Sequence, residues 1–185
     1  EVVEKKNFNV IMTSSKCLTG TDRVAEASKK IKSNIFINVQ GDEPLVSPKD
    51  IKKIIAAKKK YSDKVICGFS EINKNESPFN RNIPKVVLNK FNDLVYISRA
   101  VVPSTKKYNE KIKYLKQECI YAFSKKELKK FYSLKKKGKI EDLEDIEILR
   151  FFDLGVKIKM IKLSKNTIEV DEKKDIYKVE KILKK

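Results

Sequence analysis

Two acidic residues follow a short apolar segment and have the side chains that a magnesium site needs. Residues 35–39 are apolar, and Gln40-Gly41-Asp42-Glu43-Pro44 comes directly after them. Ligands of open α/β sheets bind at the carboxyl ends of strands, glycine permits close backbone approach, and Mg²⁺ takes one or two carboxylates with substrate phosphates. Gly-Asp is also a common pair in ordinary turns. The residues alone therefore leave both interpretations open, with Asp42 as the candidate metal ligand.

Two further polar segments could hold an anion or a metal ion. The segment Thr19-Gly20-Thr21-Asp22-Arg23 precedes a predicted helix, and free backbone N–H groups at a helix N-terminus favour anions. A plain helix cap explains the same residues. Asp171 follows residues 168–170 and precedes the last predicted helix, so it is either a second acidic ligand or a cap.

Scarce arginines mark two more segments. Asn80-Arg81-Asn82 is followed by Lys85, and Ser98-Arg99 comes at the end of a predicted strand. Arginine offers a planar fork of N–H groups that suits carboxylates and phosphates. A surface ion pair is the alternative for each of them.

The residue types that are absent exclude several kinds of chemistry. The chain has no histidine, which excludes Ser-His-Asp and Cys-His catalysis and histidine-bound zinc. Its cysteines, Cys17, Cys67 and Cys119, are far apart and odd in number, which favours neither a disulfide framework nor a thiolate zinc site. They indicate the reducing cytoplasm. Because no stretch approaches the roughly 18 apolar residues of a membrane span, we expect no membrane segment.

The composition is strongly basic, with a formal net charge of +18. Only Arg23, Arg81, Arg99 and Arg150 among the 43 basic residues are arginines, and the lysines are spread along the whole chain. Charge alone would permit a nucleic-acid binder. Lysine-coated solvent faces explain it as well, and the chain has no zinc-finger pattern, no aromatic RNA-binding segment and no arginine-rich arm. We therefore expect no nucleic-acid partner, and a basic protein still attracts a nucleoside triphosphate and an acidic sugar.

The predicted elements alternate between strands and helices, which is typical of one α/β domain over residues 1–185. The expected strands are 9–13, 35–39, 64–69, 85–88, 94–97, 120–123 and 157–163, with a hairpin turn at 89–93. The first expected helix is capped by Thr21 or Asp22, and the second begins at Pro48 after the cap Ser47. The others open with the capping box at 124–127, begin at Asp145, and follow Asp171. Gly155 is expected to end the helix that begins at Asp145.

Taken in order, these segments resemble the 3-deoxy-manno-octulosonate (Kdo) cytidylyltransferase family, also called CMP-Kdo synthetases. The matching blocks are 12–14, 20–26, 38–45, 79–82, 85–88, 96–99, 120–122, 147–150 and 170–171. Each block is short, but together they lie in register over nearly the whole chain, and Gln-Gly-Asp-Glu-Pro is an especially specific block.

The resemblance implies a Rossmann-like nucleotide-diphospho-sugar transferase fold, with a mixed, mostly parallel central sheet flanked by helices. It also implies a homodimer, and a reaction in which CTP and Kdo give CMP-Kdo and pyrophosphate with Mg²⁺, for lipopolysaccharide or surface-polysaccharide synthesis. By the family pattern Asp42 and Asp171 would be the catalytic, magnesium-holding pair. The sugar would contact Gln40, Arg99, Gln117, Tyr121 and Glu147, and the nucleotide would contact Gly20, Thr21 and Arg23.

The sequence departs from the family pattern at several points. The family's first strand and triphosphate-binding loop have no counterpart in residues 1–185, the family's sugar-binding histidine is Gln117, and Glu118-Cys119 replaces small residues. The family's Glu-Gln-Leu-Arg is the segment 147–150, in which isoleucine takes the place of the amide. The alternatives are therefore activation of a sialic-acid-like sugar, an inactive truncated copy, and a basic nucleic-acid-binding module.

Overall fold

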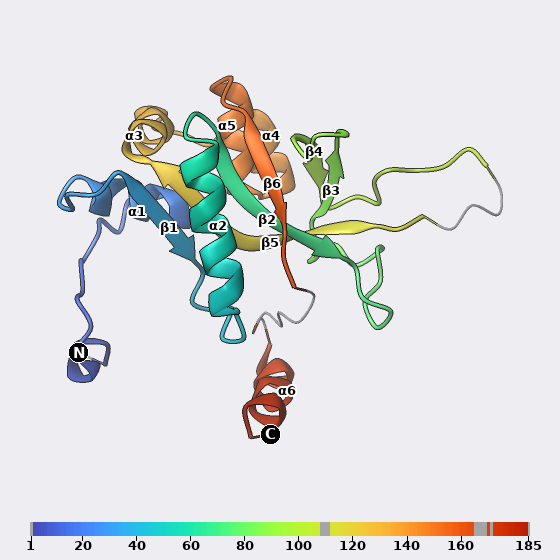
Figure 1. The fold of residues 1–185 in the computed structure, drawn as a ribbon, viewed down its shortest axis with the longest axis horizontal. Helices are drawn as coiled ribbons and strands as arrows, with labels where there is room; N and C mark the ends of the chain where they lie inside the picture. Colours follow the sequence, from blue (N-terminus) through green and yellow to red (C-terminus); the bar gives the residue numbers. More distant parts are fainter. Residues whose placement is uncertain (1, 108–111, 165–169, 171, 185) are drawn as a thin grey trace.

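The computed structural model describes residues 2–107, 112–164, 170 and 172–184, which fold into a mixed sheet flanked by helices (Figure 1). The helical elements are η1 (Glu4–Lys6), α1 (Gly20–Ser28), α2 (Pro48–Lys60), α3 (Lys125–Ser133), α4 (Lys139–Glu144), η2 (Glu147–Leu149), α5 (Arg150–Asp153) and α6 (Lys173–Leu183). The strands are β1 (Ile35–Val39), β2 (Val65–Glu71), β3 (Lys85–Leu88), β4 (Leu94–Ser98), β5 (Leu115–Ser124) and β6 (Ile158–Lys162). The predicted α/β class is confirmed.

Strand β5 is the central strand of the sheet and pairs with three other strands. One of its edges pairs with β2, and the sheet continues from β2 to β6. Its other edge is shared, because β3 pairs near Lys116 and β1 pairs from Ile120 onward. The stretch of β5 between these two pairings has neither neighbour beside it, which leaves a gap between the end of β1 and the start of β3.

The expected mostly parallel pairing is wrong for the described strands. Only β2 and β6 pair in parallel, whereas β5 is antiparallel to β1, β2 and β3, and β3 is antiparallel to β4. The register shows that β1, β2, β3 and β6 do run in the same direction. The pairings are antiparallel because β5 lies between these strands and runs the opposite way. The carboxyl ends of the four strands still point toward one edge.

Alternating side chains of β5 divide the core into two layers. Tyr121 and Phe123 pack into the cluster that is covered by α1, α3 and the segment of η2 and α5. Ile120 and Ala122 point to the other face, where they pack against Ile54 of α2. This alternation is the normal consequence of the two-residue period of a strand that is covered on both faces.

Local sequence signals fix several helix ends where they were predicted. The Ser47 side chain accepts from the backbone N–H of Lys49 at the start of α2, and the predicted capping box of α3 is present between Ser124 and Glu127. Gly155 takes a left-handed φ of 61° after α5, a conformation that costs glycine little. The hairpin of β3 and β4 is confirmed as well.

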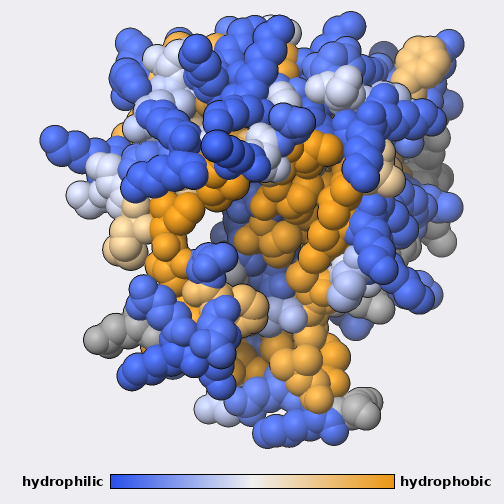
Figure 2. All heavy atoms as spheres, turned by 60° about the vertical axis from the view of Figure 1, so that its left-hand side comes forward, coloured by the Kyte–Doolittle hydropathy of each residue, from blue (hydrophilic) through white to orange (hydrophobic). Residues whose placement is uncertain are grey.

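The predicted strand at residues 9–13 is wrong. These residues belong to no strand, and Met12 is 81% exposed. A β-branched, apolar run becomes a strand only where a neighbour supplies backbone hydrogen bonds, and β1 pairs only with β5 among the described strands. Figure 2 shows apolar side chains gathered on the side of the molecule where this segment lies, framed by hydrophilic ones.

Two predicted helices differ from the structure in their bounds. Helix α1 is capped by Thr19, two or three residues before the expected cap at Thr21 or Asp22, and ends at Ser28. The predicted helix at 145–154 is broken, because Asp145 adopts a left-handed conformation that ends α4 and Ile146 is extended. Helical structure resumes only as η2 and α5. The break turns the segment toward the gap beside β5.

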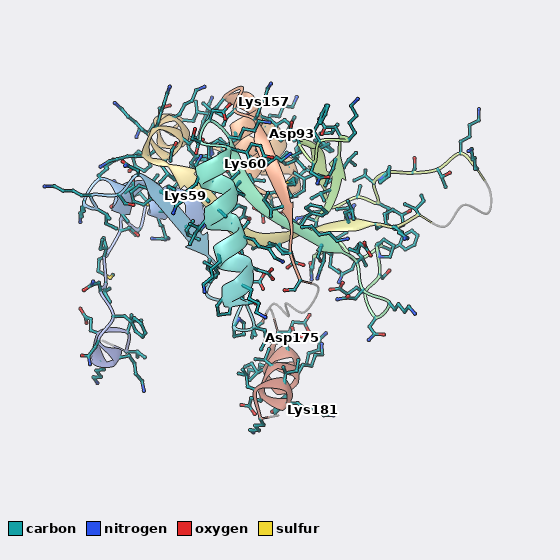
Figure 3. The ribbon with its side chains drawn as sticks, viewed as in Figure 1. Lys59, Lys60, Asp93, Lys157, Asp175 and Lys181 are labelled. Atoms are coloured by element: carbon teal, nitrogen blue, oxygen red, sulfur yellow. The ribbon has the colours of Figure 1, made fainter. Side chains whose placement is uncertain are left out.

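Lysines cover the solvent faces, as the composition suggested. Figure 3 shows Lys59, Lys60 and Lys157 on the side of the molecule away from the carboxyl end of β1. On this same side Lys64 forms an ion pair with Asp93. Among the described residues, no helix is long and apolar enough to cross a membrane.

A buried ion cluster joins the helices behind the pocket wall. Arg150 has no exposed surface, and its guanidinium donates to both oxygens of Asp22 in α1 and to both oxygens of Glu141 in α4. The same group lies 4.0 Å from the ring centroid of Phe131. Two carboxylates and an aromatic face thus surround a single cation.

Replacing Arg150 by methionine should lower the free energy of unfolding by about 3–5 kcal/mol, because two buried carboxylates lose their counter-ion. Urea denaturation followed by circular dichroism measures this. The matched control is Lys137→Met, which removes a more exposed pair with Asp145 and should cost less than about 1 kcal/mol. Equal losses in the two variants would contradict the role given to the buried cluster.

Candidate active site

A pocket of about 500 Å³ opens at the gap between the end of β1 and the start of β3. Its volume lies within the range of roughly 300–1,000 Å³ that is usual for small-molecule sites. The lining residues come from the end of β1, the segment before β3, the end of β4, the middle of β5, the segment between α4 and η2, and the start of α6. They are Gln40, Asp42, Asn82, Pro84, Arg99, Gln117, Cys119, Tyr121, Asp145, Ile146, Glu147 and Glu172.

The acidic motif after β1 forms one wall of this pocket. Gln40 and Asp42 both line it. The Oδ1 atom of Asp42 is buried and has no hydrogen-bond partner among the described residues. A buried carboxylate oxygen without a donor is costly, so this atom suits a bound cation. No cluster of three or more acidic, cysteine or histidine side chains that could hold a metal occurs among the described residues.

Asp171 lies outside the described residues. Its neighbour Val170 is described, and the backbone N–H of Val170 donates to the carbonyl oxygen of Asp42 at 2.9 Å. The segment that leads to the second predicted acid is therefore tied to the first one, although the two are far apart in the sequence.

The floor of the pocket is a neutral hydrogen-bonded group of side chains from β5 and β2. The Gln117 amide donates to the Tyr121 hydroxyl at 2.9 Å and approaches the Cys67 sulfur at 3.7 Å. Burial raises the pKa of the Cys67 thiol to about 12 and the pKa of Tyr121 well above its usual range. Both groups are therefore uncharged at neutral pH. The register shift between β2 and β5 falls beside this floor, and such a bulge redirects side chains.

Arg99 enters from the end of β4 and is held by backbone oxygens. Its Nε donates to the carbonyl of Glu144, Nη1 to that of Arg81 and Nη2 to that of Asp145. Each terminal nitrogen carries a second N–H group, and neither of these has an acceptor among the described residues. Arg99 thus keeps donors for a ligand in the pocket.

Glu147 is fixed at the N-terminus of α1. One of its oxygens accepts from the backbone N–H of Thr21 and the other accepts from the Thr21 hydroxyl, both at 2.9 Å. The Cα of Gly20 faces the same carboxylate, and a Cβ there would lie 3.6 Å from it. In this structure Gly20 and Thr21 therefore hold an acidic side chain of the pocket.

The three residues predicted for the nucleotide, Gly20, Thr21 and Arg23, are not among the lining residues. Gly20 and Thr21 lie against Glu147, whereas the Arg23 guanidinium donates to the Thr13 hydroxyl and to the Ser14 carbonyl oxygen, in residues that do not line the pocket. The six described residues predicted for the metal and the sugar, namely Gln40, Asp42, Arg99, Gln117, Tyr121 and Glu147, do come together.

Several lining residues were not predicted as site residues. Asp145 and Ile146 were assigned to a helix, and the left-handed Asp145 instead turns them into the pocket wall. Asn82 belongs to the Asn80-Arg81-Asn82 segment marked in the sequence, and Cys119 lies between Gln117 and Tyr121, but neither was predicted as a site residue. The sequence offered no signal for Asp145, because the end of α4 at Glu144 is known only from the structure.

A model of the cytidylyltransferase family matches residues 1–158. The chain belongs to this family. It is 33% identical over 177 residues to the 3-deoxy-manno-octulosonate cytidylyltransferase of Flavobacterium johnsoniae, covering 94% of the chain and 72% of the relative. It is 34% identical to the enzyme of the same name from Thermodesulfovibrio yellowstonii, covering 98% of the chain and 76% of the relative.

A solved structure supports the same assignment. The structure titled CMP:2-keto-3-deoxy-manno-octonic acid synthetase complexed with CTP superposes with a TM-score of 0.89 at 29% identity. The match covers 98% of this cytidylyltransferase chain and 75% of the other one. The fold of the described residues is therefore that of a CMP-Kdo synthetase.

The pocket of this cytidylyltransferase has the electrostatics of a cation site. Asp42, Asp145, Glu147 and Glu172 line it, and Arg99 is the one basic side chain among the lining residues that the structure describes. Four carboxylates beside one guanidinium repel a bare polyanion. The arrangement instead suits a ligand that arrives with, or next to, a divalent cation.

Thr21→Val should lower the free energy of unfolding by about 1.5–3 kcal/mol, the usual worth of a hydrogen bond to a charged group. Thr21 is 1% exposed, so water does not replace the lost hydroxyl. Thermal or urea unfolding provides the measurement, and Thr21→Ser, which keeps the hydroxyl, should lose clearly less. If serine were the more damaging change, packing of the methyl group would matter more than the Glu147 contact.

Proposed function

We propose that this protein transfers CMP from CTP to Kdo or a closely related acidic sugar and releases pyrophosphate. The observation that carries the proposal is that one pocket contains Asp42 together with the five residues expected to contact the sugar. Family membership and the similarity to a CMP-Kdo synthetase supply the reaction class.

The acidic character of the sugar is matched by Arg99. Its guanidinium is held by three carbonyl oxygens and still has an N–H group on each terminal nitrogen for a ligand. Arginine binds carboxylates through such paired donors. Gln40, Gln117 and Tyr121 supply neutral donors and acceptors of the kind that recognise hydroxyl groups, and Glu147 adds an acceptor.

Magnesium fits the acidic side of the same pocket. The buried, unpartnered Oδ1 of Asp42 is a ready ligand, and Asp171 is the proposed second one, supported by the hydrogen bond from Val170 to Asp42. A bound Mg²⁺ ion would neutralise phosphate charge and orient the triphosphate. This use of the carboxylates explains why an acidic pocket serves an anionic substrate.

The protein's own part in the reaction is positioning and charge control. An anomeric hydroxyl oxygen of the sugar forms a bond to the α-phosphorus of CTP and releases its proton to solvent. The bond from that phosphorus to the oxygen bridging it to the β-phosphate breaks, and pyrophosphate leaves with the electron pair. Arg99 orients the sugar carboxylate, the floor of Gln117 and Tyr121 fixes the hydroxyls, and Asp42 directs the reacting phosphate. The homodimer and the role in surface-polysaccharide synthesis stay predictions.

Asp42→Asn should reduce pyrophosphate release at least about a hundredfold, because a neutral amide loses several kcal/mol of metal-directed charge stabilisation. The assay contains the complete protein, CTP, Mg²⁺ and Kdo, and a coupled enzyme detects pyrophosphate.

The matched control is Asp63→Asn, an exposed aspartate in the turn between α2 and β2, which should keep the wild-type rate. Release that is equal in both variants would remove Asp42 from the mechanism. No release by folded wild-type protein with any acidic sugar would overturn the proposed function.

Arg99→Lys should raise the KM for the sugar about tenfold or more and leave the KM for CTP within about twofold, because a point charge replaces a two-pronged contact. Initial rates measured with the sugar and then CTP varied give the KM for each substrate separately. An unchanged sugar KM would assign the carboxylate to another group.

A further inference from the structure

The backbone N–H and carbonyl groups of Arg99 are both hydrogen bonded to charged side chains. Its N–H donates to Oε2 of Glu144 at 2.8 Å, and its carbonyl oxygen accepts from the Lys85 ammonium at 2.6 Å. The carbonyl of Glu144 also accepts from the Arg99 Nε. Neither Lys85 nor Glu144 lines the pocket, so both would act on a ligand only through Arg99.

Lys85 is fully buried without a carboxylate partner among the described residues. Its residue exposure is 0%, and its ammonium also donates to the carbonyl oxygen of Asn80 at 3.0 Å. No carboxylate lies within ion-pair distance of it among the described residues. Burial, followed by the nearby guanidinium of Arg99, lowers the pKa of Lys85. Buried charges are normally paired because desolvation is costly, so this one is retained at a cost to stability.

Lys58 shows what a purely structural buried lysine looks like in the same protein. It is 2% exposed and also donates to two backbone carbonyl oxygens, those of Ser62 and Lys64. Its ammonium, however, meets the carboxylate of Glu127 at 2.7 Å. Both lysines therefore tie loops together, but Lys58 is neutralised by its own ion pair and Lys85 is not.

Glu144 holds the other side of Arg99 in its charged form. Burial opposes its ionisation, but hydrogen bonds from the Ser98 hydroxyl and the Arg99 N–H outweigh burial and lower the pKa of Glu144. The Tyr96 hydroxyl also donates to this carboxylate at 3.2 Å. The acid thus ties the end of β4 to the end of α4.

We propose that Lys85 and Glu144 are a positioning pair that fixes Arg99 for its contact with the acidic substrate. The proposal rests on the proposed function, because it deepens the part given there to Arg99. Lys85 joins the Arg99 carbonyl to the Asn80 turn, and the next carbonyl of that turn, from Arg81, accepts from the Arg99 guanidinium. Without the ammonium, the carbonyl oxygens of Asn80 and Arg99 lose the donor that joins them.

The first test compares Lys85→Met with Lys58→Met. We expect Lys85→Met to raise the KM for Kdo about tenfold while the KM for CTP changes less than about twofold. Lys58→Met should lose stability, but both KM values should stay near wild type. A Lys85→Met variant that raises both KM values equally would overturn the proposal.

A double-mutant cycle tests whether Lys85 acts through Arg99. In an Arg99→Ala background the added Lys85→Met change should lower kcat/KM for the sugar by less than about threefold, against about tenfold in wild type, because residues of one network are not additive. Equal losses in the two backgrounds would contradict the positioning role. If Lys85→Met does not fold, Glu144→Gln takes its place and should give the same separation between sugar and CTP.

A readout without substrate separates this proposal from the proposed function. The chain has four arginines, so a ¹⁵N spectrum of arginine Nε groups is simple. The Nε–H groups of Arg99 and Arg150 are hydrogen bonded and should exchange slowly with water. Lys85→Met or Glu144→Gln should speed exchange at Arg99 and leave Arg150 unchanged, even if no sugar is turned over. Unchanged exchange at Arg99 in both variants would overturn the proposal.

Discussion

The buried guanidinium of Arg150 is the contact on which the pocket wall depends. It joins Asp22 of α1 to Glu141 of α4, and these two helices carry the groups that Glu147 and Arg99 need. Helix α1 presents Thr21 to the Glu147 carboxylate, and the end of α4 presents the carbonyls of Glu144 and Asp145 to Arg99. Because a desolvated cation between two acids tolerates little displacement, the two helix ends keep a fixed separation across one side of the pocket.

The reversed strand β5 supplies the second constraint. A sheet made of neighbouring parallel strands would present a closed edge, whereas β5 accepts β3 on one part of its edge and β1 on another. The side chains of Gln117 and Cys119, which lie near the interval between these two pairings, line the pocket. The carboxyl end of β1 brings Asp42 to the same place. The site therefore arises where two strands fail to meet, as in the crevices of other open α/β sheets.

Local signals predicted much of this structure, and long-range contacts decided the rest. The apolar run before Gln40, the cap at Ser47 and the capping box at Ser124 depend on neighbouring residues, and the structure confirms them. Strand direction and the absence of a strand at residues 9–13 depend on which segments become neighbours, and periodicity does not contain that information. The roles of Lys85 and Glu144 were equally hidden, because each role depends on which backbone atoms its charge meets in the fold.

The neutral floor of the pocket has a consequence for recognition. The family resemblance implies a histidine at this position, a residue whose charge changes near physiological pH, whereas Gln117 is an amide that does not titrate. Its donor is committed to the Tyr121 hydroxyl, and burial keeps that phenol protonated. The pattern of donors and acceptors on the floor is therefore constant across the pH range in which a histidine would switch. In the proposed function Arg99 recognises the charge of the ligand, so the selection of an acidic ligand and the selection of its hydroxyl pattern would be carried by separate residues.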